Sequence, residues 1–215
     1  AQRAHSKNNR CYARLMLYIF YADISRLDVS ASYPLSEYRL DRISKLRTPG
    51  QIRQSIGAEM LLEHAAVELC PELNLPLEID CGKNRKPFLK SGAFFFSLSH
   101  SENYAAAAVS DVEIGLDVQK RTACNIALAQ RFFAADEIGL LEERGCSDRC
   151  FTELWCRKES YIKALGTGLG TRLNSFSVLD MPWLWYGEDG IYHFAVCSRA
   201  GIYLQPEKFE KKELL

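Results

Sequence analysis

Two oxygen-bearing side chains stand at the end of an apolar stretch, in the segment Gly115–Gln119 (Gly-Leu-Asp-Val-Gln). Because side chains alternate along a β-strand, Asp117 and Gln119 would share one face and the apolar residues the other. A carboxylate beside an amide oxygen suits a hard divalent cation such as Mg2+. The alternative is that Asp117 only ends the strand and caps the turn that follows.

A second group of charged side chains lies in the stretch Trp155–Gly166, whose periodicity predicts a helix. Glu159 and Lys163 are one helical turn apart and therefore face the same way. Such a pair can be a solvated ion pair, which stabilises a helix by roughly 0.2–0.5 kcal/mol. The surrounding residues indicate instead a packed helix with its charges at the edge of a cleft. These apolar residues are Trp155, Tyr161, Ile162 and Leu165.

Hydroxyl and basic side chains gather in two further segments. Ser97–Ser101 (Ser-Leu-Ser-His-Ser) follows an aromatic stretch, and we interpret it as a polar turn. It is too short to define a nucleophile triad and lacks the setting of a Gly-x-Ser-x-Gly elbow. Hydroxyls, an imidazole and backbone N–H groups suit a phosphate better. The basic turn Lys83–Lys86, closed by Pro87, is either a second phosphate contact or a solvated loop.

The composition limits the classes of partner. The 215 residues include 27 lysines and arginines and 27 aspartates and glutamates, which gives a net charge of zero. A nucleic-acid partner that needs a large basic excess is therefore not expected. An anionic ligand would have to be held by a local cluster of basic residues.

The eight cysteines could form four disulfides, but a chain of this length can bury a core without them. We interpret them as reduced thiols of a cytoplasmic protein. The closest set, Cys146, Cys150 and Cys156, has no histidine nearby to complete a zinc site. The apolar stretch Leu15–Ile24 is too short to span a membrane and predicts a core strand.

The hydropathy pattern predicts the elements that must position these groups. A helix with basic side chains is expected after Pro34, with Ser36 as its cap, and Pro49-Gly50 is expected to break the chain before a second helix. A three-stranded meander is expected over 94–99, 104–109 and 113–118. The other expected elements are strands at 15–20, 77–81, 176–179 and 191–197, and helices at 52–70, 126–133, 136–144 and 149–165.

This order of elements predicts an α+β fold built from two halves of roughly 100 residues each. The segment Tyr104–Ser110 resembles Tyr192–Ser198, which is compatible with an internal duplication. Two strands of similar composition would also match in this way by chance, so the duplication stays open on this observation alone.

The order and spacing of these motifs resemble the 4'-phosphopantetheinyl transferases of the surfactin-synthetase-activating (Sfp) type, over about residues 36 to 180. Two positions depart from that family. Gln119 stands where many relatives have a second acidic residue, and Arg85 replaces the glycine before Lys86. The matching segments are Lys86-Pro87-Phe88, Ser99-His100-Ser101, Gly115–Gln119, Arg131–Phe133 with Glu137, Trp155–Lys163 with Gly166 and Gly168, and Ser175–Ser177.

The resemblance implies a pseudo-dimer of two similar α/β subdomains. The N-terminal half, 1–111, would form the coenzyme A-binding side, and the C-terminal half, 112–215, would carry the metal and catalytic residues. The implied reaction moves the 4'-phosphopantetheine arm of coenzyme A to a serine of an apo acyl or peptidyl carrier protein and releases adenosine 3',5'-bisphosphate. The implied cofactor is Mg2+, or Mn2+. A cytoplasmic monomer without a nucleic-acid or membrane partner is expected.

The resemblance also implies roles for individual residues. Glu159 would act as the base, and Lys163 would neutralise or protonate the departing phosphate. Arg53 and His100 would contact the 3'-phosphate of coenzyme A, and the carrier would dock near 120–133, where Lys120, Arg121 and Arg131 could meet an acidic helix. The implied metal ligands are Asp117, Gln119 and Glu159, and the implied coenzyme A contacts are Arg53, Lys86, Pro87, Ser99, His100, Lys158 and Lys163. Arg39, Arg42 and Lys45 match the family's N-terminal helix loosely.

Two other functions stay open at this point. Because Gln119 contributes no charge, the chain could be a non-catalytic homologue that binds coenzyme A or a carrier. Asp117 and Glu159 could also serve a metal-dependent phosphate-ester hydrolase.

Overall fold

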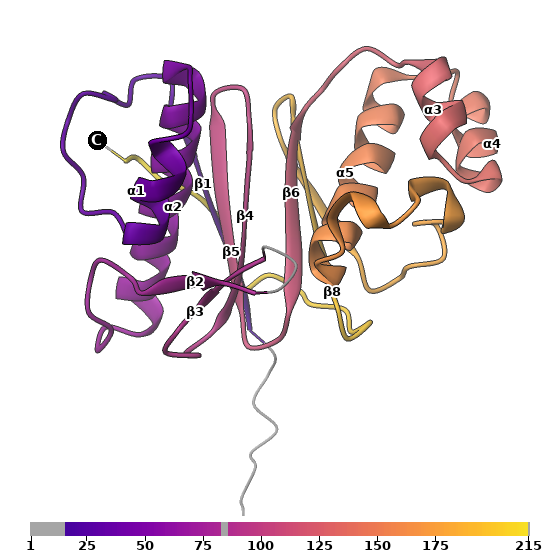
Figure 1. Cartoon of the computed structure of the whole chain (residues 1–215). Coiled ribbons are helices and arrows are strands. Elements are labelled where there is room, and N and C mark those ends of the chain that lie inside the picture. Colours follow the sequence, from indigo (N-terminus) through magenta and orange to yellow (C-terminus); the bar gives the residue numbers. More distant parts are fainter. Residues whose placement is uncertain (1–15, 83–85, 215) are drawn as a thin grey trace, which may run out of the picture.

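Two β-sheets pack against each other at the centre of the computed structural model, which describes residues 16–82 and 86–214 (Figure 1). In the first sheet the strand order is β4-β5-β1-β9, and in the second it is β6-β8-β7. A separate hairpin joins β2 to β3. The strands are β1 Leu17–Asp23, β2 Ile79–Cys81, β3 Pro87–Leu89, β4 Phe95–Ser101, β5 Tyr104–Ser110, β6 Ile114–Lys120, β7 Trp185–Asp189, β8 Tyr192–Ser198 and β9 Lys208–Lys211.

Helices cover the outer faces of both sheets (Figure 1). Helix α2 packs on the first sheet and α5 on the second, which gives a helix–sheet–sheet–helix arrangement. None of the helices among the described residues has an apolar stretch that could cross a bilayer. The helices are α1 Glu37–Ile43, α2 Pro49–Leu69, α3 Ile126–Phe132, α4 Ala135–Glu143 and α5 Asp148–Leu165, with short 3-10 turns at Gly168–Gly170 and Leu173–Ser175.

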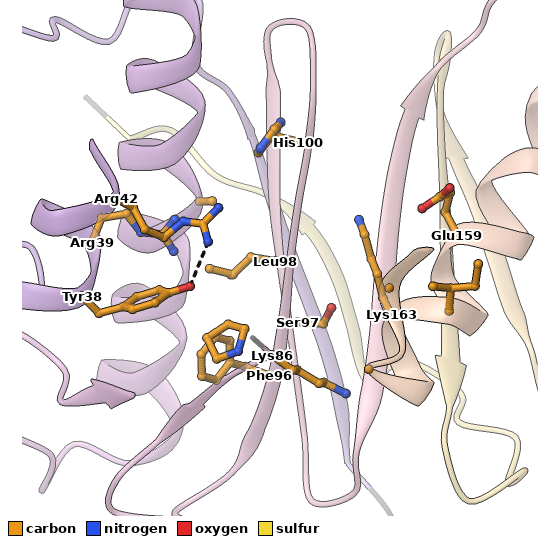
Figure 2. A pocket seen from close by; sticks show the side chains of 15 residues that line it. Tyr38, Arg39, Arg42, Lys86, Phe96, Ser97, Leu98, His100, Glu159 and Lys163 are labelled. Atoms are coloured by element: carbon orange, nitrogen blue, oxygen red, sulfur yellow. Dashed lines mark hydrogen bonds between the residues drawn. The ribbon is translucent and has the colours of Figure 1, made fainter. Parts of the chain in front are cut away.

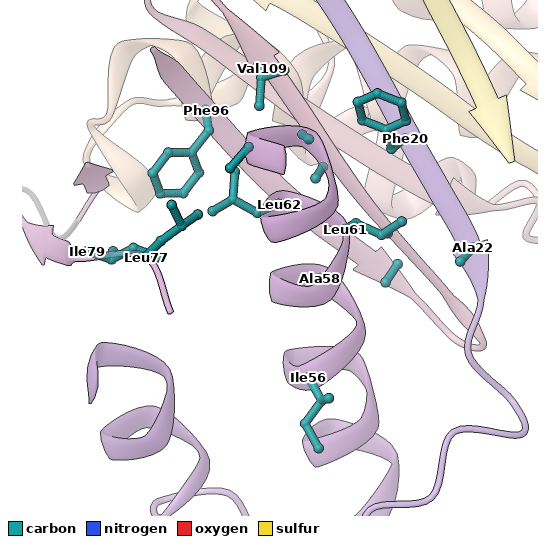
Figure 3. Close-up of a cluster of buried hydrophobic side chains, with 14 of the residues drawn as sticks. Phe20, Ala22, Ile56, Ala58, Leu61, Leu62, Leu77, Ile79, Phe96 and Val109 are labelled. Carbon is teal, nitrogen blue, oxygen red and sulfur yellow. The ribbon is translucent and has the colours of Figure 1, made fainter. Parts of the chain in front are cut away.

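The hydrophobic side chains form one cluster at each interface between layers. Figure 3 shows the cluster between α2 and the first sheet, where Leu61 and Leu62 pack near Phe20 and Phe96. A second cluster fills the space between the sheets, and a third lies beneath α5. Strand β5 is buried throughout, and its four alanines alternate between the first and second clusters. Small side chains there allow a helix and a sheet to approach β5 from opposite sides.

The two sheets are also joined along the edges of β4 and β6 by serine hydroxyls. The Oγ atoms of Ser97, Ser99 and Ser101 accept hydrogen bonds from the backbone N–H groups of β6, at 2.9, 3.1 and 3.0 Å. The donors are alternate residues of β6, namely Leu116, Val118 and Lys120. The expected polar turn at 97–101 is therefore wrong, because these residues are a strand whose hydroxyls satisfy the neighbouring strand's backbone.

Most of the expected elements are present, and the exceptions have physical reasons. The three middle strands form, but they are not one meander, because β6 leaves β5 and pairs with β8. Pro49-Gly50 does not break the chain before the second helix. Pro49 is the first residue of α2, and the side chain of Thr48 caps it. A proline suits that position since its missing N–H would have no partner there.

In the C-terminal part, one expected strand is absent and one strand is present that was not expected. Residues 176–179 are not a strand, because the backbone there is bound by buried side chains: Lys158 Nζ donates to Phe176 O and Val178 N donates to Glu137. The charged segment Lys208–Lys211 forms β9 instead and pairs in parallel with β1. The C-terminal segment thus returns to the first sheet.

Helix α5 approaches β6 so closely that Gly115 has no room for a side chain. A Cβ atom at Gly115 would overlap backbone atoms of Ser160 and Ala164 in α5. This contact fixes the separation between the strand that carries Asp117 and the helix that carries Glu159.

We expect Gly115→Ala to lower the free energy of unfolding by about 3 kcal/mol or more, because rigid backbone must move to admit the methyl group. Denaturant unfolding measures this loss. Gly139→Ala is the matched control, since a Cβ there meets nothing within 4 Å and the residue lies inside α4. That variant should gain about 0.5–1 kcal/mol. Equal stabilities of the two variants would contradict the packing described here.

Candidate active site

A cavity of about 400 Å³ opens between α1, β4 and the C-terminal end of α5. Figure 2 shows its two sides: Tyr38, Arg39 and Arg42 come from α1, and Glu159 and Lys163 come from α5. Lys86 lies at the lower side of this view and His100 at the upper side. The cavity therefore carries several basic groups on its walls and a carboxylate on one of them, although the whole chain has no net charge.

Asp117 is buried beside this cavity, and only one of its two carboxylate oxygens has a hydrogen-bond partner among the described residues. Its Oδ1 lies 2.7 Å from Lys163 Nζ and accepts a hydrogen bond of 3.0 Å from Ser99 Oγ. Its Oδ2 is buried and has no hydrogen-bond partner among the described residues. An unpaired buried carboxylate oxygen costs free energy, so it points to a ligand that completes it.

Glu159 and Gln119 are the neighbouring oxygen donors. Burial and the negative charge of Asp117 raise the pKa of Glu159, while Lys163 opposes that shift. Gln119 is half-buried on the same face of β6 as Asp117, as the strand alternation predicts. Two carboxylates and an amide oxygen are ligands that a small divalent cation accepts, and Asp117 Oδ2 has no described partner to compete for it. Within 16–82 and 86–214 no group of three or more His, Cys, Asp and Glu side chains is placed to hold a metal ion, so the acidic part of this site consists of two carboxylates.

Lys163 joins the two halves of the site. Its Nζ donates to Asp117 Oδ1 at 2.7 Å and to Ser99 Oγ at 2.8 Å. The side chain keeps 31% of its surface exposed and lines the cavity. The spacing-based prediction that Glu159 and Lys163 face a cleft is thus confirmed by their shared position on the cavity wall.

The hydroxyl of Ser99 is fully engaged by the protein. It donates to Asp117 and accepts from Lys163 Nζ and from the backbone N–H of Val118. The family resemblance implies a coenzyme A contact for Ser99, but the structure gives this hydroxyl the task of orienting Asp117 and Lys163.

The remaining basic groups of the cavity differ in how far they are already hydrogen-bonded to the protein. His100 is exposed in the cavity, where desolvation and the charges of Lys163 and Arg39 lower its pKa. Lys86 donates to a backbone carbonyl of β6, Ile114 O at 3.0 Å, and to one of α5, Ala164 O at 3.2 Å, and burial lowers its pKa. Pro87 lines the cavity next to it.

Helix α1 supplies Arg39 and Arg42 to the cavity wall, although the sequence motifs match there only loosely. Arg42 is exposed on the cavity wall, and its Nη1 donates to Tyr38 Oη at 3.2 Å. Arg39 also lines the cavity, but its Nε is paired with the buried Glu59 at 2.7 Å. Tyr38 is a third cavity residue of α1, which none of the sequence motifs includes. The available signal was its spacing of four residues from Arg42 on a capped helix.

Two residues expected at the site are not brought to it. Lys158 is a fully buried residue of α5, and its Nζ lies 2.7 Å from Glu137 and donates to Leu173 O and Phe176 O. Arg53 donates to the backbone of Leu27 at 3.0 Å and does not line the cavity. The expected contacts of both residues with a phosphate are not supported by this arrangement. Arg85 lies outside the described residues.

Comparison with known proteins matches this site to one family. Residues 113–188 match the 4'-phosphopantetheinyl transferase superfamily model, a segment that contains Asp117, Glu159 and Lys163. The chain is 30% identical over 185 residues to the 4'-phosphopantetheinyl transferase psf-1 of Bacillus pumilus, covering 76% of each chain. The chain belongs to the 4'-phosphopantetheinyl transferase superfamily.

Two further relatives in this superfamily match shorter segments. The 4'-phosphopantetheinyl transferase gsp of Aneurinibacillus migulanus is 34% identical over 128 residues, covering 57% of this chain and 52% of the relative. Sfp of Bacillus subtilis (strain 168) is 36% identical over 85 residues, covering 39% and 38%. The expected resemblance to the Sfp type is confirmed, and the chain is an enzyme of this class.

We expect Lys158→Met to destabilise this transferase without changing the ligand affinity of the cavity. Removing the lysine leaves Glu137 buried without its cation, which costs about 3–5 kcal/mol. Denaturant unfolding measures the loss, and calorimetric titration with inorganic pyrophosphate measures the affinity of the folded variant.

Lys163→Met is the matched control on the same helix. It should lose pyrophosphate affinity and less stability than Lys158→Met, because Lys163 keeps 31% of its side chain exposed whereas Lys158 and Glu137 are both fully buried. A Lys158→Met variant that keeps its stability but loses pyrophosphate affinity would show that Lys158 contacts the ligand, contrary to this prediction.

Proposed function

We propose that this chain transfers the 4'-phosphopantetheine arm of coenzyme A to a serine hydroxyl of an apo acyl or peptidyl carrier protein. The new bond joins the serine oxygen to the phosphorus of the arm. The bond from that phosphorus to the bridging oxygen breaks, and adenosine 3',5'-bisphosphate leaves. The observation that carries the proposal is the unpaired, buried Asp117 Oδ2 beside Glu159, in a cavity with basic walls.

The cavity has the charges that such a substrate needs. Coenzyme A carries a pyrophosphate and a 3'-phosphate, and both require cationic or N–H groups nearby. Lys163 lies next to the carboxylates, where the pyrophosphate would bind. Arg42 on the α1 wall and His100 on β4 are basic side chains with donors that no described residue uses, which suits the 3'-phosphate. Lys86 and Pro87 would contact the adenosine portion.

A divalent cation, Mg2+ or Mn2+, would be held by Asp117 and Glu159, with Gln119 as a further oxygen ligand. When bound, it would neutralise charge on the pyrophosphate during the displacement. The unpaired Oδ2 of Asp117 and the raised pKa of Glu159 both support this assignment, because a cation there would relieve both costs.

Glu159 and Lys163 have positions that suit opposite proton roles. The half-buried carboxylate of Glu159 is more basic than an ordinary glutamate, so it can take the proton of the carrier serine, directly or through water. Lys163 can stabilise the charge that develops on the departing bisphosphate. Ser99 and Asp117 hold the Lys163 ammonium in place for that purpose.

The helix–sheet–sheet–helix arrangement supports a pseudo-dimer with halves at 1–111 and 112–215. Each half contains a sheet covered by one long helix, and β5 and β8 are fully buried strands with similar sequences. Tyr104 and Tyr192, the first residues of these two strands, stack with ring centroids 3.8 Å apart. The substrate cavity would then lie between the halves, with β9 as an arm of the second half that pairs with the first. A single chain would complete the site, as in a monomer.

We expect the wild-type chain to add the mass of phosphopantetheine to an apo carrier protein when it is incubated with coenzyme A and Mg2+. Mass spectrometry of the carrier and detection of adenosine 3',5'-bisphosphate read out the reaction. No mass gain on any of several acyl and peptidyl carriers would contradict the proposal and favour a non-catalytic binding protein. Release of bisphosphate without an acceptor would favour a hydrolase.

Glu159→Gln should lower the transfer rate by at least about 100-fold, because the amide can neither take the serine proton nor supply a metal-binding charge. Its unfolding curve should match that of the wild type, since no hydrogen bond or ion pair of the Glu159 side chain holds the described part of the fold together. Near-normal turnover would refute the role of Glu159.

Gln119→Glu should tighten Mn2+ binding by about tenfold, because affinity for a hard cation rises with the charge of its ligands. Electron paramagnetic resonance of free Mn2+ measures binding without turnover. Gln130→Glu is the matched control, since it adds the same charge at an exposed position of α3. Equal affinities of the two variants would show that residue 119 is not a metal ligand.

A further inference from the structure

Arg121 follows the last residue of β6 and shares a face of the second sheet with Asp117 and Gln119. Its backbone N–H donates to Ile191 O at 2.6 Å, which extends the β6–β8 pairing by one residue. Two residues of strand span about 7 Å, so Arg121 lies just beyond Gln119 along the same edge of the site. Arg121 does not line the cavity described above.

A buried histidine holds the Arg121 side chain. Arg121 Nε donates to His193 Nε2 at 3.2 Å, and His193 is fully buried. Since the guanidinium can only donate, Nε2 of His193 carries no proton and the imidazole is the neutral tautomer with its proton on Nδ1. Burial, with Arg121 and Arg149 nearby, lowers the pKa of His193 to about 4 in spite of Glu188.

The orientation of His193 is fixed by a second bond. Its Nδ1 lies 2.6 Å from Tyr186 Oη, so the imidazole donates and the tyrosine accepts. The tyrosine hydroxyl in turn donates to Glu188, which is paired with Arg149 at 2.8 Å. The four side chains Arg121, His193, Tyr186 and Glu188 thus form a continuous row across β6, β8 and β7, which we call the cross-strand row.

The charge of Arg121 is left without a carboxylate. Arg149 is paired with Glu188 and Arg157 with Glu153, both within 2.8 Å. Arg121 makes no ion pair with any residue of 16–82 or 86–214, and only its Nε is used by a described partner. A guanidinium that is held by a neutral group, with its Nη atoms open, is preorganised for an external anion.

We propose that Arg121 binds a carboxylate of the acceptor protein next to the serine that is modified, and that His193 and Tyr186 are positioning residues for it. This inference rests on the proposed transferase function and narrows the acceptor surface from the segment 120–133 to one side chain. The acceptor is favoured over coenzyme A because Arg121 lies outside the basic cavity, on the side of Gln119 away from Asp117.

Steady-state transfer to an apo acyl carrier protein tests the inference, with coenzyme A and the carrier varied in turn. Arg121→Ala should raise KM for the carrier about tenfold and leave KM for coenzyme A within twofold. It should also flatten the salt dependence of the carrier KM, because one exposed charge pair is lost. Arg144→Ala, which removes an exposed arginine of the same half, is the matched control and should change neither constant.

The positioning role is tested by Tyr186→Phe and His193→Phe in the same assay, with thermal unfolding to confirm folding. Each should raise the carrier KM with kcat unchanged, and neither should add to the effect of Arg121→Ala in a double-mutant cycle. Tyr186→Phe keeps the ring and removes only the hydroxyl, so it serves if His193→Phe does not fold. Additive effects would overturn the positioning role.

A charge exchange identifies the anion. Arg121→Glu should lose transfer to the wild-type carrier and regain part of it on a carrier in which one carboxylate flanking the serine is replaced by lysine. An unchanged carrier KM in Arg121→Ala, or a raised coenzyme A KM instead, would overturn the inference while leaving the transferase function standing. Absence of transfer by the wild type would count against the transferase function itself.

Discussion

The site depends on one three-way contact across the seam between the sheets, where the hydroxyl of Ser99 on β4 meets Asp117 of β6 and Lys163 of α5. That hydroxyl also accepts from the backbone N–H of Val118, so it fixes strand, carboxylate and ammonium together. Because Ser97 and Ser101 repeat the backbone contact on either side, β4 and β6 cannot slide past each other without losing all three bonds. The seam thereby sets the distance between the basic walls of the cavity and its carboxylates.

The same contact explains why one oxygen of Asp117 is available to a ligand. Ser99 and Lys163 both bind Oδ1, so Oδ2 is buried without a partner in the described part of the chain. A fold selected only for stability would favour a partner for both oxygens, since an unsatisfied buried acceptor costs about 1–3 kcal/mol. At Gly115 the backbone of α5 lies in close contact with β6, two residues from Asp117. The free-energy cost of the unsatisfied Oδ2 thus lies at the position where a bound cation would remove it.

Sequence reasoning located most of the helices and the placement of Asp117, Glu159 and Lys163 because their signals are local. The spacing of Glu159 and Lys163 and the alternation around Asp117 follow from helix and strand periods alone. The segment Ser97–Ser101 misled because serines are frequent in turns, and only the neighbouring strand shows why a strand would carry them. The strand Lys208–Lys211 was missed since its charged residues lack a strand's hydropathy, although it pairs with β1. Arg53 could not be excluded from sequence, because its partner Leu27 is 26 residues away.

Lys158 shows the limit of motif reasoning most clearly, because it belongs to the same helix and the same motif as Lys163. Five residues at about 100° each place the two lysines roughly 140° apart around α5, so both cannot face the cavity. Lys158 is instead bound to Glu137 and to two carbonyls of the segment that follows the helix. That buried clamp prevents α5 from rotating, and the helix can then present Glu159 and Lys163 to β6 at a fixed angle. Lys158, which is buried away from the cavity, thus helps to set the direction of the two side chains of α5 that line it.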